Sequence, residues 1–511
     1  MTIIINKKGI KNFHWPISHD VYSLGNKKIL DFIIKIQNHL YRNNKDYFNI
    51  FNCLKVFIAH KLFNLFLSKK ISFLKKNNIY MNQKILVDIK SGYPQQLEKK
   101  LQEGLKKKNI LFRYLRLLKN INQNFSYIPI NLLKKKEMNI VVSDNHLIVE
   151  YLKSIKKSFF LFNLSEWFFP CSKKEYDFNK KKYKTSLDFI NFFLNRVQKL
   201  FNQLDCKLND GDIKQVKKFI IHNFFWTNLY LTRLDKKQDL LPINLLTGTH
   251  GIIWSRLLSC AVKKNGGNVI SFDHAAAGDL RKDSIKMFSE TGFANIFYTF
   301  NSKHVKYWSL SLKKYKSKFL NMRIDKIKKS KKNYVIKYNS YNSSKKKILL
   351  IAQPFVMHDL VMSCFPQPVQ FDWHLRLIHN LKKFGYDVTY KSHPLSNKKI
   401  VEKLCNTSDI KNKEGLLEKV YDKYNYLIFD CRGTTAWSVA LSTSKPIIFI
   451  DFMKSNYFKV DNLILKKRVG VIKGNIDKNN IPQINFNKLK DTINYSEKLK
   501  KNKSCFNILV N

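Results

Sequence analysis

Residues 426–451 read YLIFDCRGTTAWSVALSTSKPIIFID, and this stretch decides the fold class. A short apolar run ends in Asp430, a polar loop and an apolar helical segment over 435–441 follow, and a second apolar run, 446–451, ends in Asp451. Short apolar runs on both sides of a helix are typical of parallel strands that are buried on both faces. The stretch therefore predicts a strand-helix-strand unit of an α/β sheet.

The same pattern extends upstream and downstream of this unit. Apolar runs predict strands over 347–352 and 386–391, and helical spacing predicts helices over 374–384 and 414–421. We expect one doubly wound Rossmann-like domain over 347–475, followed by a tail with one helix over 476–511.

A second domain of the same class is predicted over 138–310. Its strands are expected over 138–143, 243–251 and 268–274, and an apolar helix over 252–262 separates the last two. A Lys-, Asn- and Ser-rich stretch, 311–346, predicts a linker between the two domains. Residues 1–137 show mostly helical spacing. Within them, 54–67 has the pattern of a core helix, although a helix lying on an acidic bilayer would have a similar one.

The charge is strongly unbalanced, with 93 Lys and Arg against 37 Asp and Glu and a formal net charge of +56 among 511 residues. Only 11 of the basic residues are Arg. Specific recognition of nucleic acid favours the guanidinium group, so a Lys-dominated excess does not indicate a specific nucleic-acid partner. It does predict attraction to anionic surfaces, including peripheral association with an anionic membrane.

The eight cysteines lie far apart, without a CxxC pattern or a Cys/His pair at zinc spacing. We therefore expect reduced thiols in a cytoplasmic protein, and neither a metal site nor a resident cofactor. The apolar run in the first residues is too short for a signal peptide. The sequence contains no stretch of about 18 uncharged apolar residues, so we expect no membrane span.

The strongest chemical signal is the loop after the strand that ends at Asp430. Arg432, Gly433, Thr434 and Thr435 stand where a helix should begin. Backbone N–H groups at a helix start, together with hydroxyls and a guanidinium, can bind a phosphate without a metal. A plain N-cap would explain the threonines and the glycine alone, but Arg432 favours anion binding because Arg is scarce in this chain.

Further candidates follow other predicted strands, where the carboxyl ends of parallel strands meet. His393 precedes a proline at one such end, and we expect it to donate to a diphosphate oxygen or to stabilise a leaving group as imidazolium. His274 is a candidate general base for an acceptor hydroxyl. The other expected cleft residues are His250, Asp273, Gln353, Asp359 and Ser438.

The order of these motifs resembles a known family. Lys391-Ser-His-Pro394, the Arg-Gly-Thr-Thr loop and Lys445-Pro-Ile-Ile-Phe-Ile-Asp451 resemble the carboxyl-terminal domain of GT-B-fold transferases of bacterial surface polysaccharides. The similar groups are CDP-glycerol glycerophosphotransferases, capsule-synthesis relatives and transferases with a Gly-Thr-Thr loop. Phe272–Gly278 looks like the Gln-His-Gly turn of that last group, with Asp273 in place of Gln. Ser438 stands where many GT-B enzymes carry a Glu that holds the donor ribose.

The resemblance covers roughly residues 240–300 and 345–455. It implies two Rossmann-like domains that face a cleft, and a metal-independent transfer of a sugar or glycerophosphate from a nucleotide-activated donor to a polysaccharide or lipid-linked hydroxyl acceptor. It places His393 and the Arg-Gly-Thr-Thr loop at the donor phosphates, and His274 on the acceptor side. Two other functions remain open: a nucleotide-sugar epimerase or hydrolase of the same fold, and a non-catalytic scaffold of a polysaccharide assembly.

Overall fold

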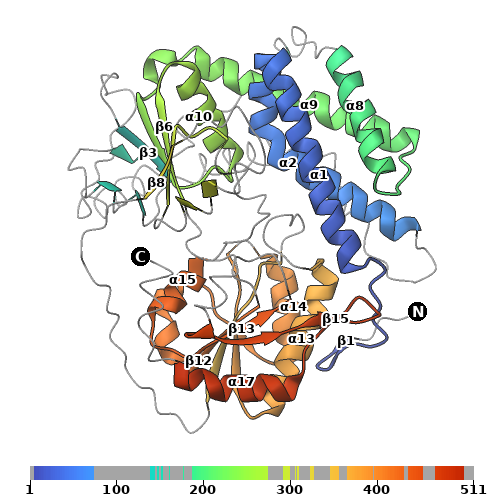
Figure 1. The fold of residues 1–511 in the computed structure, drawn as a ribbon, viewed down its shortest axis with the longest axis vertical. Coiled ribbons are helices and arrows are strands. Elements are labelled where there is room, and N and C mark those ends of the chain that lie inside the picture. The colour runs from blue at the N-terminus through green and yellow to red at the C-terminus, as the bar shows by residue number, and fades with distance from the viewer. Residues whose placement is uncertain are drawn as a thin grey trace.

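Two six-stranded parallel sheets form the centre of the protein in a computed structural model, and helices pack around both (Figure 1). One sheet is built from residues 139–326 and the other from residues 347–473. The structure describes residues 5–73, 139–143, 147–148, 151–152, 160–161, 177, 187–273, 290, 292–299, 305–306, 308–309, 323–326, 346–355, 365–394, 396–430, 435–452 and 466–499.

The carboxyl-terminal sheet has the strand order β11-β10-β9-β12-β13-β14, and all its pairings are parallel. Numbered along the chain, this is the order 3-2-1-4-5-6 of a doubly wound dinucleotide-binding sheet. The strands that follow β9 in the chain are added first on one side of it, as β10 and β11, and then on its other side, from β12 onward. The point between β9 and β12 is therefore a switch point of the sheet. The strands are β9 (Lys347–Ile351), β10 (Asp387–Lys391), β11 (Lys411–Asn412), β12 (Tyr426–Phe429), β13 (Ile447–Asp451) and β14 (Gly470–Lys473).

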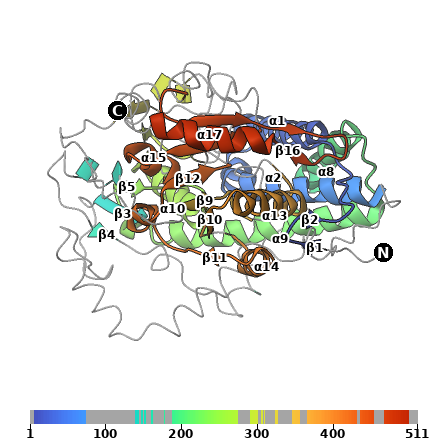
Figure 2. The same cartoon turned by 90° about the horizontal axis from the view of Figure 1, so that it is seen from below.

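Alternate residues of these strands enter two separate cores. Leu350 and Ile428 pack with the helices on one face, whereas Leu349 and Leu427 pack with α15 (Thr435–Ser442) on the other. Continuous apolar strands are the expected result of burial on both faces. The helices of the first face are α13 (Gln367–Lys383), α14 (Lys398–Ser408) and α17 (Phe486–Leu499); α14 lies at the β11 end of the sheet and α17 at the β14 end (Figure 2).

The amino-terminal sheet has the order β4-β3-β5-β6-β7-β8, again entirely parallel. Along the chain this is 2-1-3-4-5-6, with its switch point between β3 and β5. Helix α10 (Ile253–Lys264) packs on β5 and β6. The strands are β3 (Asn139–Ser143), β4 (Phe160–Leu161), β5 (Asn244–Thr247), β6 (Asn268–Phe272), β7 (Ile296–Thr299) and β8 (Arg323–Lys326).

Four long helices pack together beside this sheet: α1 (His19–Asn43), α2 (Lys45–Phe73), α8 (Leu187–Asn202) and α9 (Asp210–Asp235) (Figure 1). Leu54, Phe63 and Phe66 of α2 are no more than 1% exposed, and each such side chain stabilises the fold by about 1.5–3 kcal/mol. The segment Lys45–Lys70 is long and apolar enough to cross a membrane. Its most apolar 18-residue window has a mean hydropathy of 1.4, but 83% of that window is buried inside the protein. The burial supports the interpretation of 54–67 as a core helix.

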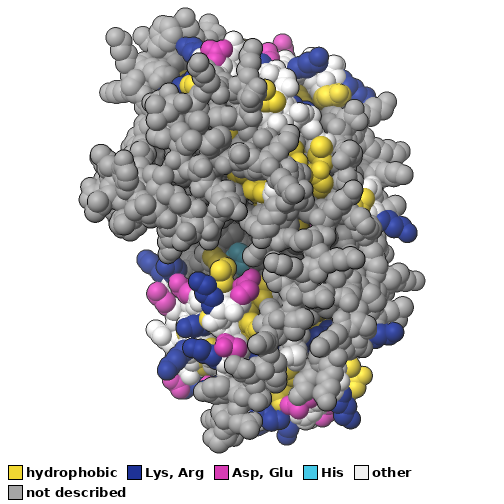
Figure 3. All heavy atoms as spheres, turned by 90° about the vertical axis from the view of Figure 1, so that its left-hand side faces the viewer, with side chains coloured by type: hydrophobic (Ala, Val, Ile, Leu, Met, Phe, Trp, Pro, Cys, Tyr) yellow, Lys and Arg dark blue, Asp and Glu magenta, His cyan; other side chains and the backbone are white. Residues whose placement is uncertain are grey.

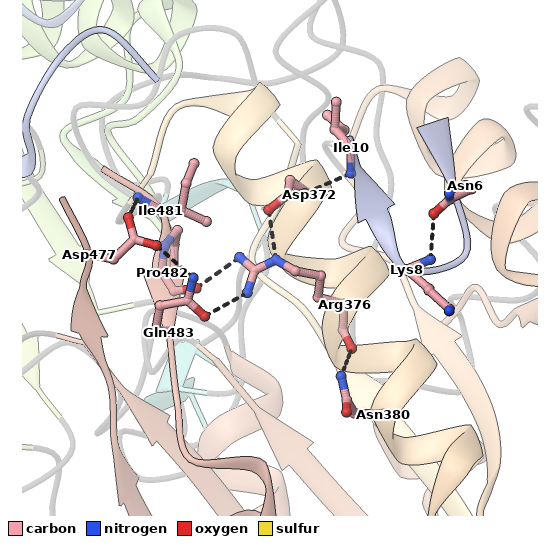
Figure 4. A network of polar contacts seen from close by, with 10 residues as sticks. All are labelled: Asn6, Lys8, Ile10, Asp372, Arg376, Asn380, Asp477, Ile481, Pro482 and Gln483. Atoms are coloured by element: carbon pink, nitrogen blue, oxygen red, sulfur yellow. Dashed lines mark hydrogen bonds and ion pairs between the residues drawn. The ribbon is translucent and has the colours of Figure 1, made fainter. Parts of the chain in front are cut away.

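The amino terminus ties the helical layer to the carboxyl-terminal sheet. Strands β1 (Ile5–Asn6) and β2 (Gly9–Ile10) form a hairpin, and the Ile10 N–H donates to Asp372 Oδ1 of α13 at 2.9 Å (Figure 4). Gly9 has a φ of +119°, and a Cβ there would lie 2.8 Å from that same oxygen, so a side chain would break the contact.

Arg376 extends this contact to the carboxyl-terminal part of the chain, at Pro482 and Gln483. Its Nε donates to Asp372 Oδ2 at 2.8 Å, and its other two nitrogens donate to the strand β16 (Pro482–Gln483) at 2.8 and 3.2 Å (Figure 4). From the hairpin the chain enters α1, which begins with Ser18 as N-cap and packs on α2 and α8. One continuous amino-terminal segment therefore contacts both halves of the molecule.

Several sequence expectations need correction. The helix expected over 414–421 is instead two 3-10 helices, Leu417–Lys419 and Tyr421–Lys423. The α-helix was expected because Leu417 and Tyr421, both buried, lie four residues apart and imitate helical spacing. Strand β8 lies within the segment expected to be only a linker. Its single apolar residue, Ile324, gives no strand pattern, and the strand pairs as the edge of the sheet beside β7.

Candidate functional site

The candidate site lies at the carboxyl ends of the strands, where polar residues of both sheets gather. In the carboxyl-terminal sheet, Gln353 follows β9, His393 follows β10 and Asp430 follows β12. The Gln353 N–H donates to Asp430 Oδ1 at 3.0 Å, so a hydrogen bond spans the switch point between β9 and β12. The structure therefore brings together two strand ends that the sequence predicts separately.

A buried histidine completes this contact. His374 of α13 lies 2.6 Å, through Nε2, from the second oxygen of Asp430, and its Nδ1 lies 3.1 Å from the Tyr390 hydroxyl of β10. All three side chains are at most 3% exposed. Burial and the nearby Asp430 carboxylate raise the pKa of Tyr390 well above its usual value, so the hydroxyl keeps its proton and can donate to Nδ1. Nε2 then carries the ring proton, and this N–H donates a hydrogen bond to Asp430.

Sequence reasoning missed the roles of His374 and Tyr390. His374 was expected only as the first residue of a helix, and the helix in fact begins seven residues earlier. The available signal was that His374 stands three, four and seven residues before Leu377, Ile378 and Leu381, the spacing of one helix face that was expected to be buried. Such a residue needs an internal partner, and the strand-end Asp430 is one.

His393 is half-buried two residues beyond the end of β10. Burial, followed by the charge of Lys391, lowers its pKa from 6.5 to about 4. At neutral pH and without a ligand the ring is therefore uncharged, and its expected role at a donor phosphate stays a prediction. The Lys391 ammonium is itself tied to the Gly415 carbonyl at 2.6 Å.

The structure places His250 in the interior, not at a cleft surface as the sequence analysis expects. It is 0% exposed, and both of its ring nitrogens are engaged. Nδ1 lies 2.7 Å from the Glu290 carbonyl and 2.8 Å from Ser271 Oγ, while Nε2 lies 2.9 Å from Ser259 Oγ. Burial is the main reason that its pKa falls to about 4. His250 therefore holds β5, β6 and α10 together and is not available to a ligand here.

Charged groups surround His250 in the same interior. The Glu290 carboxylate accepts the His250 N–H at 2.6 Å and the Thr249 hydroxyl at 3.0 Å, and Arg256 donates to the His250 carbonyl at 2.9 Å. Lys55 of α2 is fully buried close by, and burial together with Arg256 lowers the pKa of Lys55 well below its usual value. Sequence reasoning found neither Glu290 nor Lys55, because their partners lie on distant segments.

Two other expected cleft residues are also buried. Gln353 is 1% exposed, because α13 covers it and Gln370 donates to its carbonyl at 2.8 Å. Asp273, at the end of β6, is 5% exposed and its N–H donates to the Tyr298 carbonyl at 2.9 Å. Because both side chains are buried, neither is exposed to a ligand in this conformation.

The remaining predicted site residues are not placed in detail. Thr435 is the first residue of α15 and Ser438 lies within it, but neither side chain is among those described. Five predicted site residues lie outside the described residues: His274, Asp359, Arg432, Gly433 and Thr434.

Within the described residues, no group of three His, Cys, Asp or Glu side chains is arranged to hold a metal ion. The sequence contains one Asp-x-Asp spacing, Asp210–Asp212, a pattern that holds a metal in some nucleotide-sugar sites, and it lies at the start of α9. Asp212 accepts the Asn209 N–H at 2.9 Å in a capping box and forms an ion pair with Lys69, so its carboxylate caps the helix.

Comparisons with known proteins leave the family of this chain open: its sequence matches no family model, and a search of curated proteins finds no match.

Proposed function

We propose that the two sheets are the halves of a GT-B-like transferase. In this proposal the chain moves a sugar, or a glycerophosphate, from a nucleotide-activated donor to a hydroxyl of a polysaccharide or lipid-linked acceptor during bacterial surface polysaccharide synthesis. One observation carries the proposal: the switch point of the carboxyl-terminal sheet is bridged by Asp430, and the chain continues from Asp430 through Arg432-Gly433-Thr434 to the start of α15. Doubly wound sheets bind nucleotides at such switch points.

The strand orders of the two sheets support this function. Each is parallel and has one switch point, as expected for two nucleotide- or substrate-binding halves. Figure 3 shows a hollow at mid-height of the molecule, with a histidine side chain inside it. Ligands in such proteins bind in concave sites with a few polar groups.

The proposed reaction is a substitution at the activated carbon, or at phosphorus for a glycerophosphate donor. The acceptor oxygen forms the new bond, the bond to the leaving phosphate breaks, and the phosphate leaves with the electron pair. We assign the acceptor proton to His274 as general base, a role that typically contributes about 10²–10⁴-fold. Arg432, Thr434, Thr435 and the N–H groups at the start of α15 would stabilise the leaving phosphate.

His393 enters this scheme as a neutral imidazole, because its pKa is near 4. A neutral ring donates one hydrogen bond to a phosphate oxygen and adds no full charge. A bound diphosphate would raise the pKa of His393 by charge attraction. Donor binding is therefore expected to strengthen as the pH falls from 7 toward 5.

Calorimetric binding of CDP-, CMP-, UDP-, GDP- and dTDP-linked donors tests the donor site. The wild type is compared with Arg432→Ala and with Arg196→Ala, which makes the same change on the exposed side of α8. Saturable binding of one base that is lost only in Arg432→Ala supports the proposal. Absence of saturable binding to every donor contradicts it and favours the scaffold function.

Product analysis separates transfer from the related activities of the same fold. Release of free nucleotide that requires an acceptor indicates transfer, whereas release without acceptor indicates hydrolysis and an altered sugar indicates epimerisation. Within a transferase, His274→Ala should lower turnover and Arg432→Ala should weaken donor binding. Equal small effects of both changes on turnover and binding would contradict this division of roles.

We also propose peripheral association with an anionic membrane, where lipid-linked acceptors lie. The net charge of +56 supports this, because basic residues near an anionic surface each contribute about 1 kcal/mol. Flotation with vesicles containing anionic lipid tests it. Retention at about 0.15 M salt, where the screening length is roughly 8 Å, is the expected result; loss of the protein from these vesicles at that salt would contradict the proposal.

A further inference from the structure

We infer that His374 and Tyr390 are positioning residues for the donor site and that they act through Asp430. This inference rests on the proposed function, because it assigns these buried residues a role in binding the donor phosphates. Neither residue is expected to touch the donor, since both are 0% exposed.

Three elements meet at the Asp430 carboxylate, and a fourth, β10, supports it through His374. One oxygen accepts the N–H of Gln353, which follows β9, and the other accepts from His374 of α13. Tyr390 of β10 supports His374 from the far side of the ring. The carboxylate at the end of β12 is therefore held from β9, β10 and α13 at once, and its position along the sheet has little freedom.

The hydrogen-bond chain also has a single direction. A protonated Tyr390 hydroxyl donates to Nδ1, so Nε2 must carry the proton that reaches Asp430. Charge-assisted hydrogen bonds of this kind are shorter and roughly twice as strong as neutral ones. Removing the Tyr390 hydroxyl leaves Nδ1 without this donor and takes away the support of the ring from β10.

The location of the chain of bonds links it to the donor site. Asp430 is two residues before Arg432 and five before Thr435, the first residue of α15. A buried carboxylate costs desolvation energy that well-packed apolar residues would avoid, so its presence between two strand ends favours a role in geometry over one in stability alone. That geometry fixes the position of Asp430, the residue from which the chain continues toward Arg432.

The chain offers a matched control for Tyr390. Tyr426 is also a buried tyrosine of the same sheet, and its hydroxyl donates to Glu497. However, Tyr426 is the first residue of β12 and so lies at the amino end of the strand, whereas Tyr390 is the fourth of five residues in β10. Tyr426→Phe thus also removes one buried tyrosine hydroxyl, but at the amino ends of the strands, away from the candidate site.

The experiment measures the binding of inorganic pyrophosphate to the full chain by calorimetry. Pyrophosphate carries the group common to diphosphate donors and avoids a choice of base. Tyr390→Phe is expected to weaken binding by about 5–10-fold, the range of a coupling of 1–1.4 kcal/mol, while Tyr426→Phe changes it by less than about 2-fold. Thermal unfolding of both variants shows whether their stability losses are similar.

A double-mutant cycle then tests whether Tyr390 acts through the loop. If it does, Tyr390→Phe should have little further effect on pyrophosphate binding once Arg432→Ala has removed the main phosphate contact. Additive effects of the two changes, or equal effects of Tyr390→Phe and Tyr426→Phe, would overturn the inference while leaving the donor site intact. A wild type that does not bind pyrophosphate would instead overturn the proposed function, and the inference with it.

Discussion

His250 and His374 are both fully buried near the carboxyl ends of parallel strands, but they have different partners. His250 is surrounded by a carbonyl and two hydroxyls, and Arg256 donates to its main chain. His374 lies between a carboxylate and a phenol. Burial alone disfavours an imidazolium, and the partner then determines what the ring can do. With neutral partners the ring holds strands together, whereas with a carboxylate it orients a charged group at the switch point.

The largest expected effect comes from removing the carboxylate. Asp430→Ala leaves the Gln353 N–H and the His374 ring proton without their acceptor in the interior, and the free energy of unfolding should fall by about 3–5 kcal/mol. Urea denaturation measures the loss, with Asp422→Ala at an exposed position as control. A loss below about 1 kcal/mol would remove the distinction between the two histidines.

The pH dependence of stability should report His250. Its folded-state pKa, about 4, lies below its ordinary value of 6.5, so the unfolded chain binds the proton more tightly between these values. The contribution of His250 is therefore complete above pH 6.5 and is lost as the pH falls toward 4, by about 2–3 kcal/mol at pH 4.5. Because His393 titrates with the same sign, His250→Gln should remove only part of the slope.

Nitrogen-15 NMR of the histidine rings gives an independent check of the wild type. The His250 ring should stay neutral down to about pH 4.5, the range that its pKa predicts. A ring that becomes protonated near pH 6.5 would show that burial does not control this group.

A smaller effect is expected from a hydroxyl partner of His250. Because Nδ1 donates to the Glu290 carbonyl, Nε2 accepts a hydrogen bond from the Ser259 hydroxyl, and Ser259→Ala leaves the Nε2 lone pair without a donor in the interior. We expect a loss of about 1 kcal/mol, compared with no measurable change for Ser23→Ala on the exposed side of α1. Equal unfolding free energies for the two variants would mean that the hydroxyl does not stabilise His250.

The smallest effect is expected at the surface. Asp235 and Lys264 form an ion pair at 2.6 Å, and their side chains are 32% and 53% exposed. Asp235→Asn should change the free energy of unfolding by less than about 1 kcal/mol, and less still in 1 M salt, because water and ions screen exposed charges. A loss as large as that of Asp430→Ala would show that burial does not set the scale of these effects.

Sequence patterns alone determined the alternation of strands and helices in this protein. The strands β9, β10, β12 and β13 and the helix α15 fall within one or two residues of the expected ranges, because their apolar runs are local and lie between clear turns. They also placed the ends of these strands, and so the position of Asp430. The expected roles of Arg432 and His274 stay predictions.

Only the tertiary structure decided which of these segments meet. His374 and Asp430 are 56 residues apart, and Ile10 and Asp372 are 362 apart. A local sequence pattern cannot predict such pairs. A polar residue expected to be buried indicates that it needs a partner, but the pattern does not identify that partner. The edge strand β8 and the packing of α8 on α1 likewise depend on neighbours that form elsewhere in the chain. Local periodicity thus determined where the helices and strands form. The arrangement of the candidate site depends on contacts between distant segments, which must satisfy buried polar groups and cover apolar faces.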